Sequence, residues 1–153
     1  MTSNTIKNWG FVLAQFALIC VCLLGARTNL SSSNGILLVF AAVLFIGGGA
    51  LGVWALWSMG SKTFSVLPQP VPEGSLCERG PYHWLCHPMY TAVLLVCLSA
   101  WLLNPTTLTT IAWVLLLAVL IGKLRFEESL LKQQFSGYEQ YQQGRHRLVP
   151  NVW

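Results

Sequence analysis

Four apolar runs divide the chain, and polar residues gather between them and after the last one. The runs cover residues 9–26, 36–57, 90–103 and 106–121. A helix that crosses the hydrocarbon core of a bilayer needs about 17–25 apolar residues, so the first two runs predict transmembrane helices. The last two runs are shorter and are separated by Asn104-Pro105, a dipeptide typical of turns. They predict a short helical hairpin, which either just spans the bilayer or dips into it and returns.

The composition agrees with a membrane protein. Hydrophobic residues make up 54% of the 153 residues and charged residues only 9%, whereas about 25% of a soluble domain is charged. The prediction is therefore a single, all-α integral membrane domain over residues 1–153, with about four transmembrane helices. Two of these helices lie in residues 1–57, the last two form the short hairpin, and a helical cytosolic tail follows.

Lysine and arginine residues predict the orientation of these helices. If both termini are cytoplasmic, eight of the nine basic residues face the cytoplasm and only Arg27 faces out. Such an excess is the positive-inside bias of multi-pass membrane proteins. The same bias explains the net charge of +4, so the predicted surroundings are the lipid bilayer and no nucleic acid is expected as a partner.

Glycines in the second run allow close approach of another helix. Gly48 and Gly52 form a small-xxx-small pair, a pattern typical of tightly packed membrane helices. It predicts packing within the bundle or between two copies of the chain. A groove for a lipid chain is the alternative, and the pattern does not separate these readings.

The segments that flank the hairpin carry the candidate chemistry. Pro88 has a fixed φ and is a good first residue of a helix, so His87 is predicted at the helix N-terminus, where free backbone N–H groups favour anions. Glu127 and Glu128 follow the fourth run, and carboxylates near a membrane core usually have a function. The competing interpretation is a solvated helix end with a Glu128–Lys132 pair at i,i+4 spacing.

These segments together resemble the superfamily of isoprenylcysteine carboxyl methyltransferases and phospholipid methyltransferases. The resemblance covers about residues 75 to 150 and follows the order Gly-Pro-Tyr at 80–82, His-Pro-x-Tyr at 87–90, Glu-Glu at 127–128 and a Phe…Tyr…Tyr…Arg tail from Phe135. It implies an S-adenosylmethionine-dependent membrane methyltransferase that acts on a lipid-like or small apolar acceptor, such as an isoprenylcysteine-like carboxylate, a lipid amine or a thiol. Residues 58–153 then form the cofactor-binding and catalytic part. The implied cofactor-binding residues are Tyr82, His87, Pro88, Tyr90, Glu127 and Glu128, and the implied catalytic residues are Arg125 and Glu128.

Three positions depart from the family pattern. Cys86 and His83 stand where the family has arginines, and Ala92 stands where it has a glycine. Arg125 or the tail arginines could supply the missing charge; otherwise the acceptor is not a carboxylate, or the activity is reduced. Cys77, His83, Cys86 and His87 lie close together in the sequence, but their spacing fits no familiar zinc pattern, and no metal is expected.

Two other functions fit parts of the pattern. Membrane sterol and steroid reductases, which bind NADPH, share a similar C-terminal His-Pro pattern but usually have more than four helices. A non-catalytic membrane protein that keeps the fold is the second alternative. Binding of S-adenosylmethionine, of NADPH or of neither separates the three.

Overall fold

The computed structural model describes residues 3–26, 34–59 and 76–148. In chain order its elements are α1 (Ser3–Ala26), α2 (Gly35–Met59), the 3-10 helix η2 (Gly80–His83), α3 (Pro88–Leu103), α4 (Thr107–Gln134) and α5 (Tyr138–Gln143). An isolated parallel bridge joins Leu85 to His146. The described residues therefore form an all-helical chain, as predicted.

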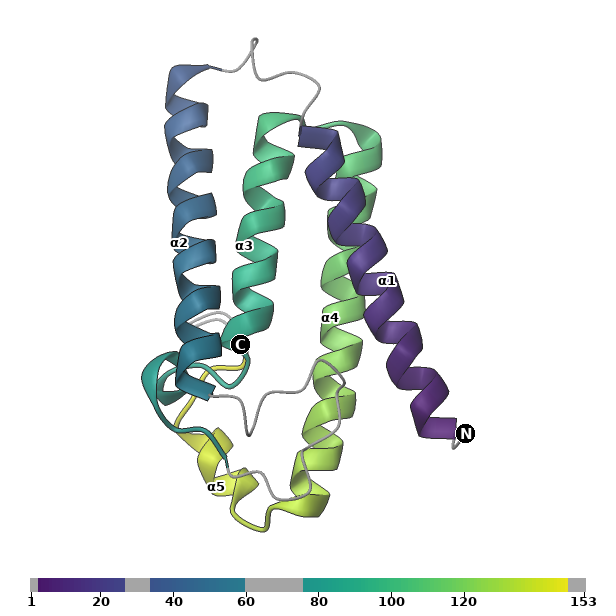
Figure 1. Cartoon of the computed structure of the whole chain (residues 1–153), viewed down its shortest axis with the longest axis vertical. Coiled ribbons are helices and arrows are strands. Elements are labelled where there is room, and N and C mark those ends of the chain that lie inside the picture. The colour runs from purple at the N-terminus through teal and green to yellow at the C-terminus, as the bar shows by residue number, and fades with distance from the viewer. Residues whose placement is uncertain (1–2, 27–33, 60–75, 149–153) are drawn as a thin grey trace.

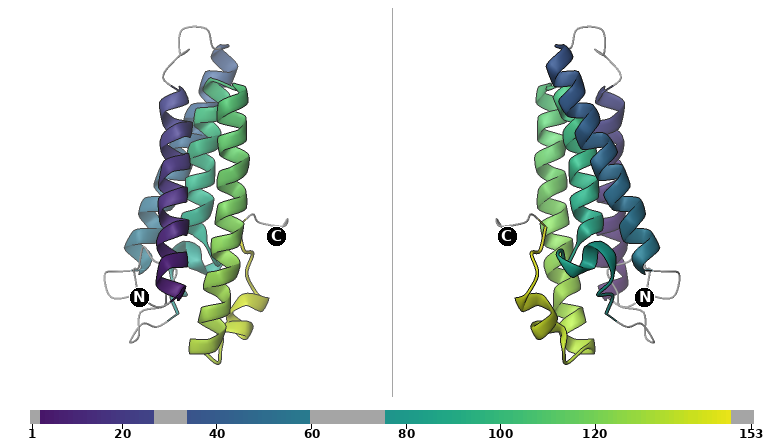
Figure 2. Two further views of the ribbon diagram at one scale, coloured as in Figure 1. Left: turned by 90° about the vertical axis from the view of Figure 1, so that its right-hand side faces the viewer. Right: turned by 90° about the vertical axis from the view of Figure 1, so that its left-hand side faces the viewer.

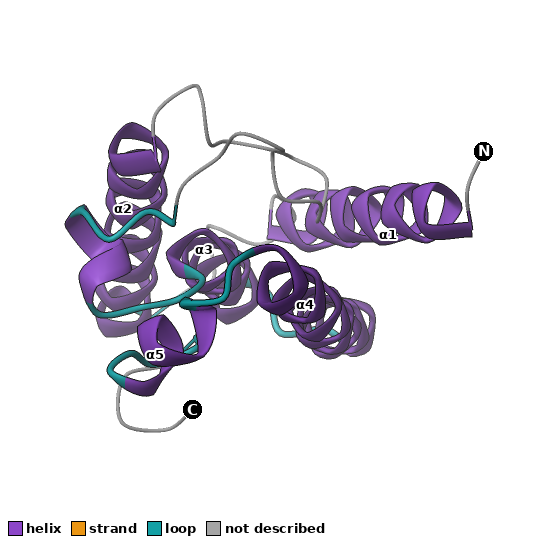
Figure 3. Ribbon diagram, turned by 90° about the horizontal axis from the view of Figure 1, so that it is seen from below, coloured by secondary structure: helices purple, strands orange, loops and turns teal. Residues whose placement is uncertain are grey.

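The four long helices lie side by side with α3 at the centre. Helix α3 contacts α1, α2 and α4, while α1 also packs along α4 (Figures 1 and 3). The start of α1, the end of α2, the start of α3 and the end of α4 lie at the same end of the bundle. Helix η2 and the short α5 lie at this end too, and α5 turns back beside the lower part of α4 (Figures 1 and 2). Segments that are far apart in the sequence thus meet at one end.

The helices differ in whether they are long enough to cross a membrane. Within the described residues, Trp9–Ala26, Gly35–Met59 and Thr107–Gln134 are long and apolar enough to cross a membrane, and Pro88–Leu103 is apolar but shorter. The 16 residues of α3 extend about 24 Å at roughly 1.5 Å per residue, somewhat less than a core of about 30 Å. Large apolar side chains remain exposed on α1 and α2, as lipid-facing helices require. The chain is a multi-pass membrane protein.

The predicted hairpin is present, but its second helix is longer than predicted. Helix α4 has 28 residues and continues through Gln134, whereas the apolar run ends at Ile121. The helix continues because the following Lys, Arg, Glu, Leu and Gln residues are good helix formers although they are polar or charged. The turn lies at the opposite end of the bundle from the start of α3 (Figure 1), so the hairpin runs the length of the bundle.

Side-chain hydrogen bonds define the hairpin turn. Thr106 caps α4, because its side chain accepts from the backbone of Thr109 and the Thr109 side chain accepts from the backbone of Thr106. Asn104 donates from Nδ2 to the carbonyl oxygen of Gly25 at 2.8 Å. The turn is therefore tied to the end of α1 as well as to α4.

The glycines of α2 allow close packing against α3. A Cβ added at Gly48 would lie 3.0 Å from the carbonyl oxygen of Ala92 and equally close to Leu95 and Val96, and one at Gly52 would lie 3.4 Å from the Ala92 Cβ. The small-xxx-small pair therefore serves packing within the chain, which was one of the predicted interpretations.

Candidate functional site

His87 lies at the start of α3, where the sequence predicted it. Pro88 is the first residue of the helix and His87 is its N-cap. The His87 side chain is buried, with 6% of the residue exposed. Its ring stacks on that of Tyr90, with centroids 5.4 Å apart and planes 4° apart. Proline at the helix start and this stacking together direct the imidazole toward α4.

Two carboxylates from α4 face His87. The Nδ1 atom of His87 lies 3.8 Å from Oε2 of Glu127, and its Nε2 atom lies 3.5 Å from Oε1 of Glu128. The hydroxyl of Tyr90 donates a hydrogen bond to Oε2 of Glu127 at 2.6 Å. We call His87, Tyr90, Glu127 and Glu128 the histidine–carboxylate cluster. The structure brings these four predicted residues together from two helices.

Glu128 is held by residues of the C-terminal tail. Its Oε1 atom accepts hydrogen bonds from Nε2 of Gln142 at 2.7 Å and from Nε of Arg147 at 3.1 Å. The Glu128 side chain is only 8% exposed, so the interpretation of a solvated helix end is wrong. Lys132 instead pairs with Glu139 at 3.3 Å. The tail closes over the end of α4 and leaves Glu128 enclosed.

Backbone hydrogen bonds fasten this tail to the loop before α3. Cys86 N donates to the His146 carbonyl at 2.8 Å, His146 N donates to the Trp84 carbonyl at 2.9 Å, and His87 N donates to the Arg147 carbonyl at 3.1 Å. Thr91 also donates from Oγ1 to the Leu148 carbonyl at 2.6 Å. These bonds place Arg147 beside Glu128.

Tyr82 lies in the loop before α3 and contacts the tail. Its carbonyl oxygen accepts from Nε of Arg145 at 2.9 Å, and its buried hydroxyl is directed at the sulfur of Met59. Burial, and then the nearby Cys77 and Glu127, raise the pKa of the Tyr82 hydroxyl. Arg145 also lies over the Tyr141 ring at 3.9 Å. Tyr82 and Arg145 thus join the loop to the tail.

Arg125 and the tail arginines, the two predicted sources of positive charge, lie at different distances from the cluster. Arg125 is exposed on α4, whereas Arg147 bonds Glu128. Of the positions where the family has arginines, His83 is exposed and Cys86 is buried. Cys86 packs against Tyr138 and Tyr141, and burial followed by the Glu128 carboxylate raises the pKa of its thiol to about 11. Arg147 of the tail, rather than Arg125, brings positive charge to the cluster.

Two buried polar atoms at this end have no hydrogen-bond partner among the described residues. They are Nε2 of His87 and the hydroxyl of Tyr138. Tyr138 is 1% exposed, and burial followed by Glu128 raises the pKa of its hydroxyl. An unbonded buried polar group costs about 1–3 kcal/mol. Of the two, His87 Nε2 still lies 3.5 Å from Oε1 of Glu128, and the Tyr138 hydroxyl indicates a place for a polar ligand.

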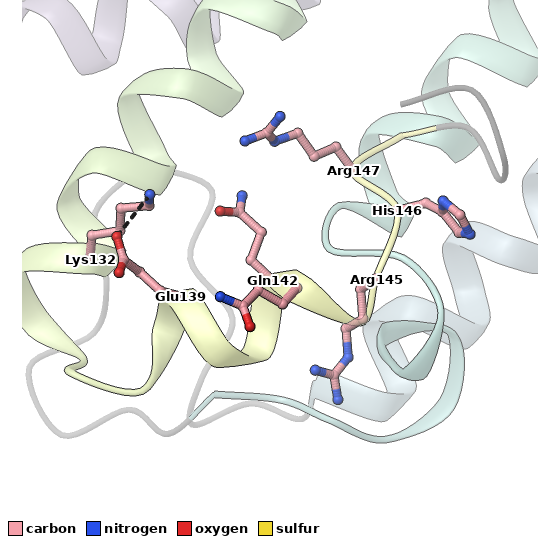
Figure 4. Close-up of a pocket in the computed structure, with 7 residues that line it drawn as sticks. Lys132, Glu139, Gln142, Arg145, His146 and Arg147 are labelled. Atoms are coloured by element: carbon pink, nitrogen blue, oxygen red, sulfur yellow. Dashed lines mark hydrogen bonds and ion pairs between the residues drawn. The ribbon is translucent and has the colours of Figure 1, made fainter.

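A polar cavity opens next to Glu128. It has a volume of about 440 Å³ and is lined by Lys132, Glu139, Gln142, Gln143, Arg145, His146 and Arg147. In Figure 4 the side chains of Gln142 and Arg147 reach into the space, while those of Arg145 and His146 point away from it. Since Gln142 and Arg147 bond Glu128, the cavity and the cluster share a wall. Among the described residues, no group of three or more His, Cys, Asp and Glu side chains could hold a metal ion.

Sequence reasoning missed several members of the site. Gln142 carried no signal, because a glutamine in a polar tail is ordinary. Lys123 was treated as a cytoplasmic cation and is in fact 4% exposed inside the bundle. Arg147 and Tyr138 were recognised only as part of the tail pattern.

The described residues thus form a helical membrane bundle with a histidine–carboxylate cluster at one end. The model of the phospholipid methyltransferase family matches residues 36–137, more than half of the chain. The chain therefore belongs to the phospholipid methyltransferase family, within the superfamily that the sequence resembles. No curated protein and no solved structure matches it.

Proposed function

We propose that the chain is a membrane methyltransferase that uses S-adenosylmethionine and acts on a lipid-like or small apolar acceptor. One observation supports this most directly. His87, at the N-terminus of α3, lies between two carboxylates of α4, with its ring nitrogens 3.8 Å from Glu127 and 3.5 Å from Glu128. The family match agrees with methyl transfer.

The residues present fit this cofactor. A sulfonium and an amino group are positively charged, and Glu127 and Glu128 offer negative charge beside them. The Tyr138 hydroxyl, which has no hydrogen-bond partner among the described residues, offers a hydrogen bond to its polar groups, and the start of α3 favours its carboxylate. When bound, the cofactor supplies an electrophilic methyl group on a positively charged sulfur.

The proposal gives each predicted residue a role. Glu127 and Glu128 bind the cofactor, Tyr90 orients Glu127, and Pro88 places His87. Tyr82 joins the loop to Arg145 of the tail and lies outside the cluster. The positive charge assigned to Arg125 belongs instead to Arg147, which orients Glu128 and faces the cavity.

Methyl transfer places few chemical demands on the protein beyond positioning. Holding the two reacting groups in line can supply a large part of the rate. A carboxylate acceptor needs no base, whereas an amine or a thiol must lose a proton. His87 or one of the two carboxylates beside it would take this proton.

The acceptor reaches the site from the bilayer. The cluster and the cavity lie at one end of a bundle whose outer surface is apolar, so a lipid-like molecule can approach from the membrane. With both termini cytoplasmic, this end faces the cytosol. Arg27 and Lys62, on which the orientation partly depends, lie outside the described residues, and the orientation remains a prediction.

Calorimetry on the full chain in detergent tests the proposal. We expect S-adenosylmethionine to bind and NADPH not to bind. Transfer of a radiolabelled methyl group to lipid extracted from vesicles then tests the acceptor class. Binding of NADPH instead would favour a reductase, and binding of neither would favour a non-catalytic membrane protein.

A further inference from the structure

Lys123 is a buried cation in α4, one helical turn before Glu127. Only 4% of it is exposed, and an ionised side chain inside a membrane protein is costly unless it is paired. Its ammonium group donates a hydrogen bond to Oε1 of Gln15, on α1, at 2.9 Å. It also lies over the ring of Tyr90, 5.2 Å from the centroid, within the range of a cation–π interaction.

Tyr90 connects this cation to the histidine–carboxylate cluster. One face of the Tyr90 side chain stacks on His87, and its hydroxyl bonds Glu127 at 2.6 Å. Lys123 and Glu127 are four residues apart, so they share a face of α4. Lys123 therefore holds the Tyr90 ring while Glu127 holds its hydroxyl, and a displaced Tyr90 would disturb both His87 and Glu127.

We propose that Lys123 is a positioning residue for the methyl-transfer site: together with Gln15 it holds Tyr90 in place against His87 and Glu127. Helix α1 thereby becomes part of the support of the site. The family match begins at residue 36 and does not include α1. The effect on cofactor binding rests on the proposed function, whereas the ordering of Tyr90 does not.

A purely structural role for Lys123 makes a different prediction. If it only joined α1 to α4, its loss would lower stability but leave Tyr90 and the site of the folded protein unchanged. Thr109 provides a matched control, because it is also buried in α4 and hydrogen-bonded, to the Asn104 carbonyl at 2.8 Å. It lies at the other end of α4, away from the cluster.

The test uses the full chain in detergent with 3-fluorotyrosine incorporated only at Tyr90. Fluorine NMR reports the order of this ring, and calorimetry with S-adenosylmethionine reports the affinity of the site. For Lys123→Met we expect a shifted or broadened resonance. We also expect the Kd of S-adenosylmethionine to rise about tenfold, the loss expected for a buried cation–π contact. Lys123→Arg keeps the cation and should restore much of the Tyr90 resonance and of the cofactor affinity. Thr109→Val should change neither the resonance nor the affinity.

An unchanged resonance in folded Lys123→Met would overturn the proposal, as would a changed resonance with unchanged cofactor affinity. An equal effect of Thr109→Val would do the same. If Lys123→Met does not fold, Gln15→Leu is the second variant, because it removes the hydrogen-bond partner of Lys123 and keeps the cation. It should also shift or broaden the Tyr90 resonance. A wild-type spectrum and wild-type cofactor affinity of Gln15→Leu would then refute the inference. Failure of the wild-type chain to bind S-adenosylmethionine would reject the proposed function, while the fluorine spectra would still decide whether Lys123 orders Tyr90.

Discussion

Replacing Glu128 with glutamine tests the central contact of the site. The change keeps the size of the side chain and removes its charge. Glu128 accepts from Gln142 at 2.7 Å and from Arg147 at 3.1 Å, and it lies 3.5 Å from His87. Gln142 can still donate to the new amide oxygen, but Arg147 loses its carboxylate partner, and a cationic cofactor loses one of the two negative charges at the site.

The expected magnitude follows from these contacts. A hydrogen bond to a charged group contributes about 1.5–3 kcal/mol, and about 1.4 kcal/mol corresponds to a factor of ten in affinity. Glu128→Gln should therefore weaken S-adenosylmethionine binding by roughly 10- to 100-fold. The loss of folding stability should be smaller, since Arg147 is 35% exposed and remains in contact with water. A change of about 1 kcal/mol would lower the melting temperature by roughly 4 °C.

Calorimetry and thermal unfolding in detergent measure both quantities. Glu78→Gln is the matched control, because Glu78 also pairs with an arginine, at 3.2 Å from Arg145, but is 63% exposed; its loss should leave cofactor affinity unchanged. Equal affinities of wild-type and Glu128→Gln protein, both folded, would refute the role of Glu128. An equal loss in Glu78→Gln would show that any change at this end of the bundle weakens binding.

Three further predictions concern the membrane orientation, the packing of α2 and the buried thiol. A reporter fused after Trp153 should be active in the cytoplasm, given the eight-to-one distribution of basic residues, and activity restricted to the periplasm or lumen would contradict the proposed orientation. Gly48→Val should lower the melting temperature by several degrees, because even a Cβ at this position meets the Ala92 carbonyl at 3.0 Å; an unchanged melting temperature would argue against the α2–α3 contact. The thiol of Cys86 has a pKa raised to about 11, so mass spectrometry should find slow maleimide labelling at pH 8 in the folded protein. Rapid labelling of folded protein at pH 8 would contradict the burial of Cys86. Because the folded protein favours the neutral thiol, the contribution of Cys86 to folding stability should be fully present below about pH 9 and lost as the pH rises toward 11.

The sequence predicted well what depends on neighbouring residues. Apolar runs of sufficient length indicated the membrane helices, Asn104-Pro105 marked the hairpin turn, and Pro88 indicated the start of α3 with His87 before it. Each of these signals is local, since it arises from the hydrophobicity or the backbone geometry of consecutive residues. The motif order then brought His87, Tyr90, Glu127 and Glu128 together as candidates, and the structure places them in contact.

Features that depend on distant residues could not be predicted in this way. Lys123 resembled a cytoplasmic loop cation, because its partner Gln15 lies 108 positions earlier in the sequence. Arg147 could not be chosen over Arg125, since the choice depends on the tail folding back onto the loop before α3. The end of α4 was placed too early because the change from apolar to charged residues marks the membrane boundary and not the end of the helix.

The backbone bonds between the tail and the loop before α3 have a consequence for biosynthesis. His87 cannot donate to the Arg147 carbonyl until sixty more residues have been translated. During that time α3 can enter the membrane, because apolar helices insert as they emerge. The cluster, however, lacks the arginine and the glutamine that enclose Glu128. A chain truncated after α4 would thus be inserted but have an open, incomplete cluster, and the cluster is completed only once the tail has left the ribosome.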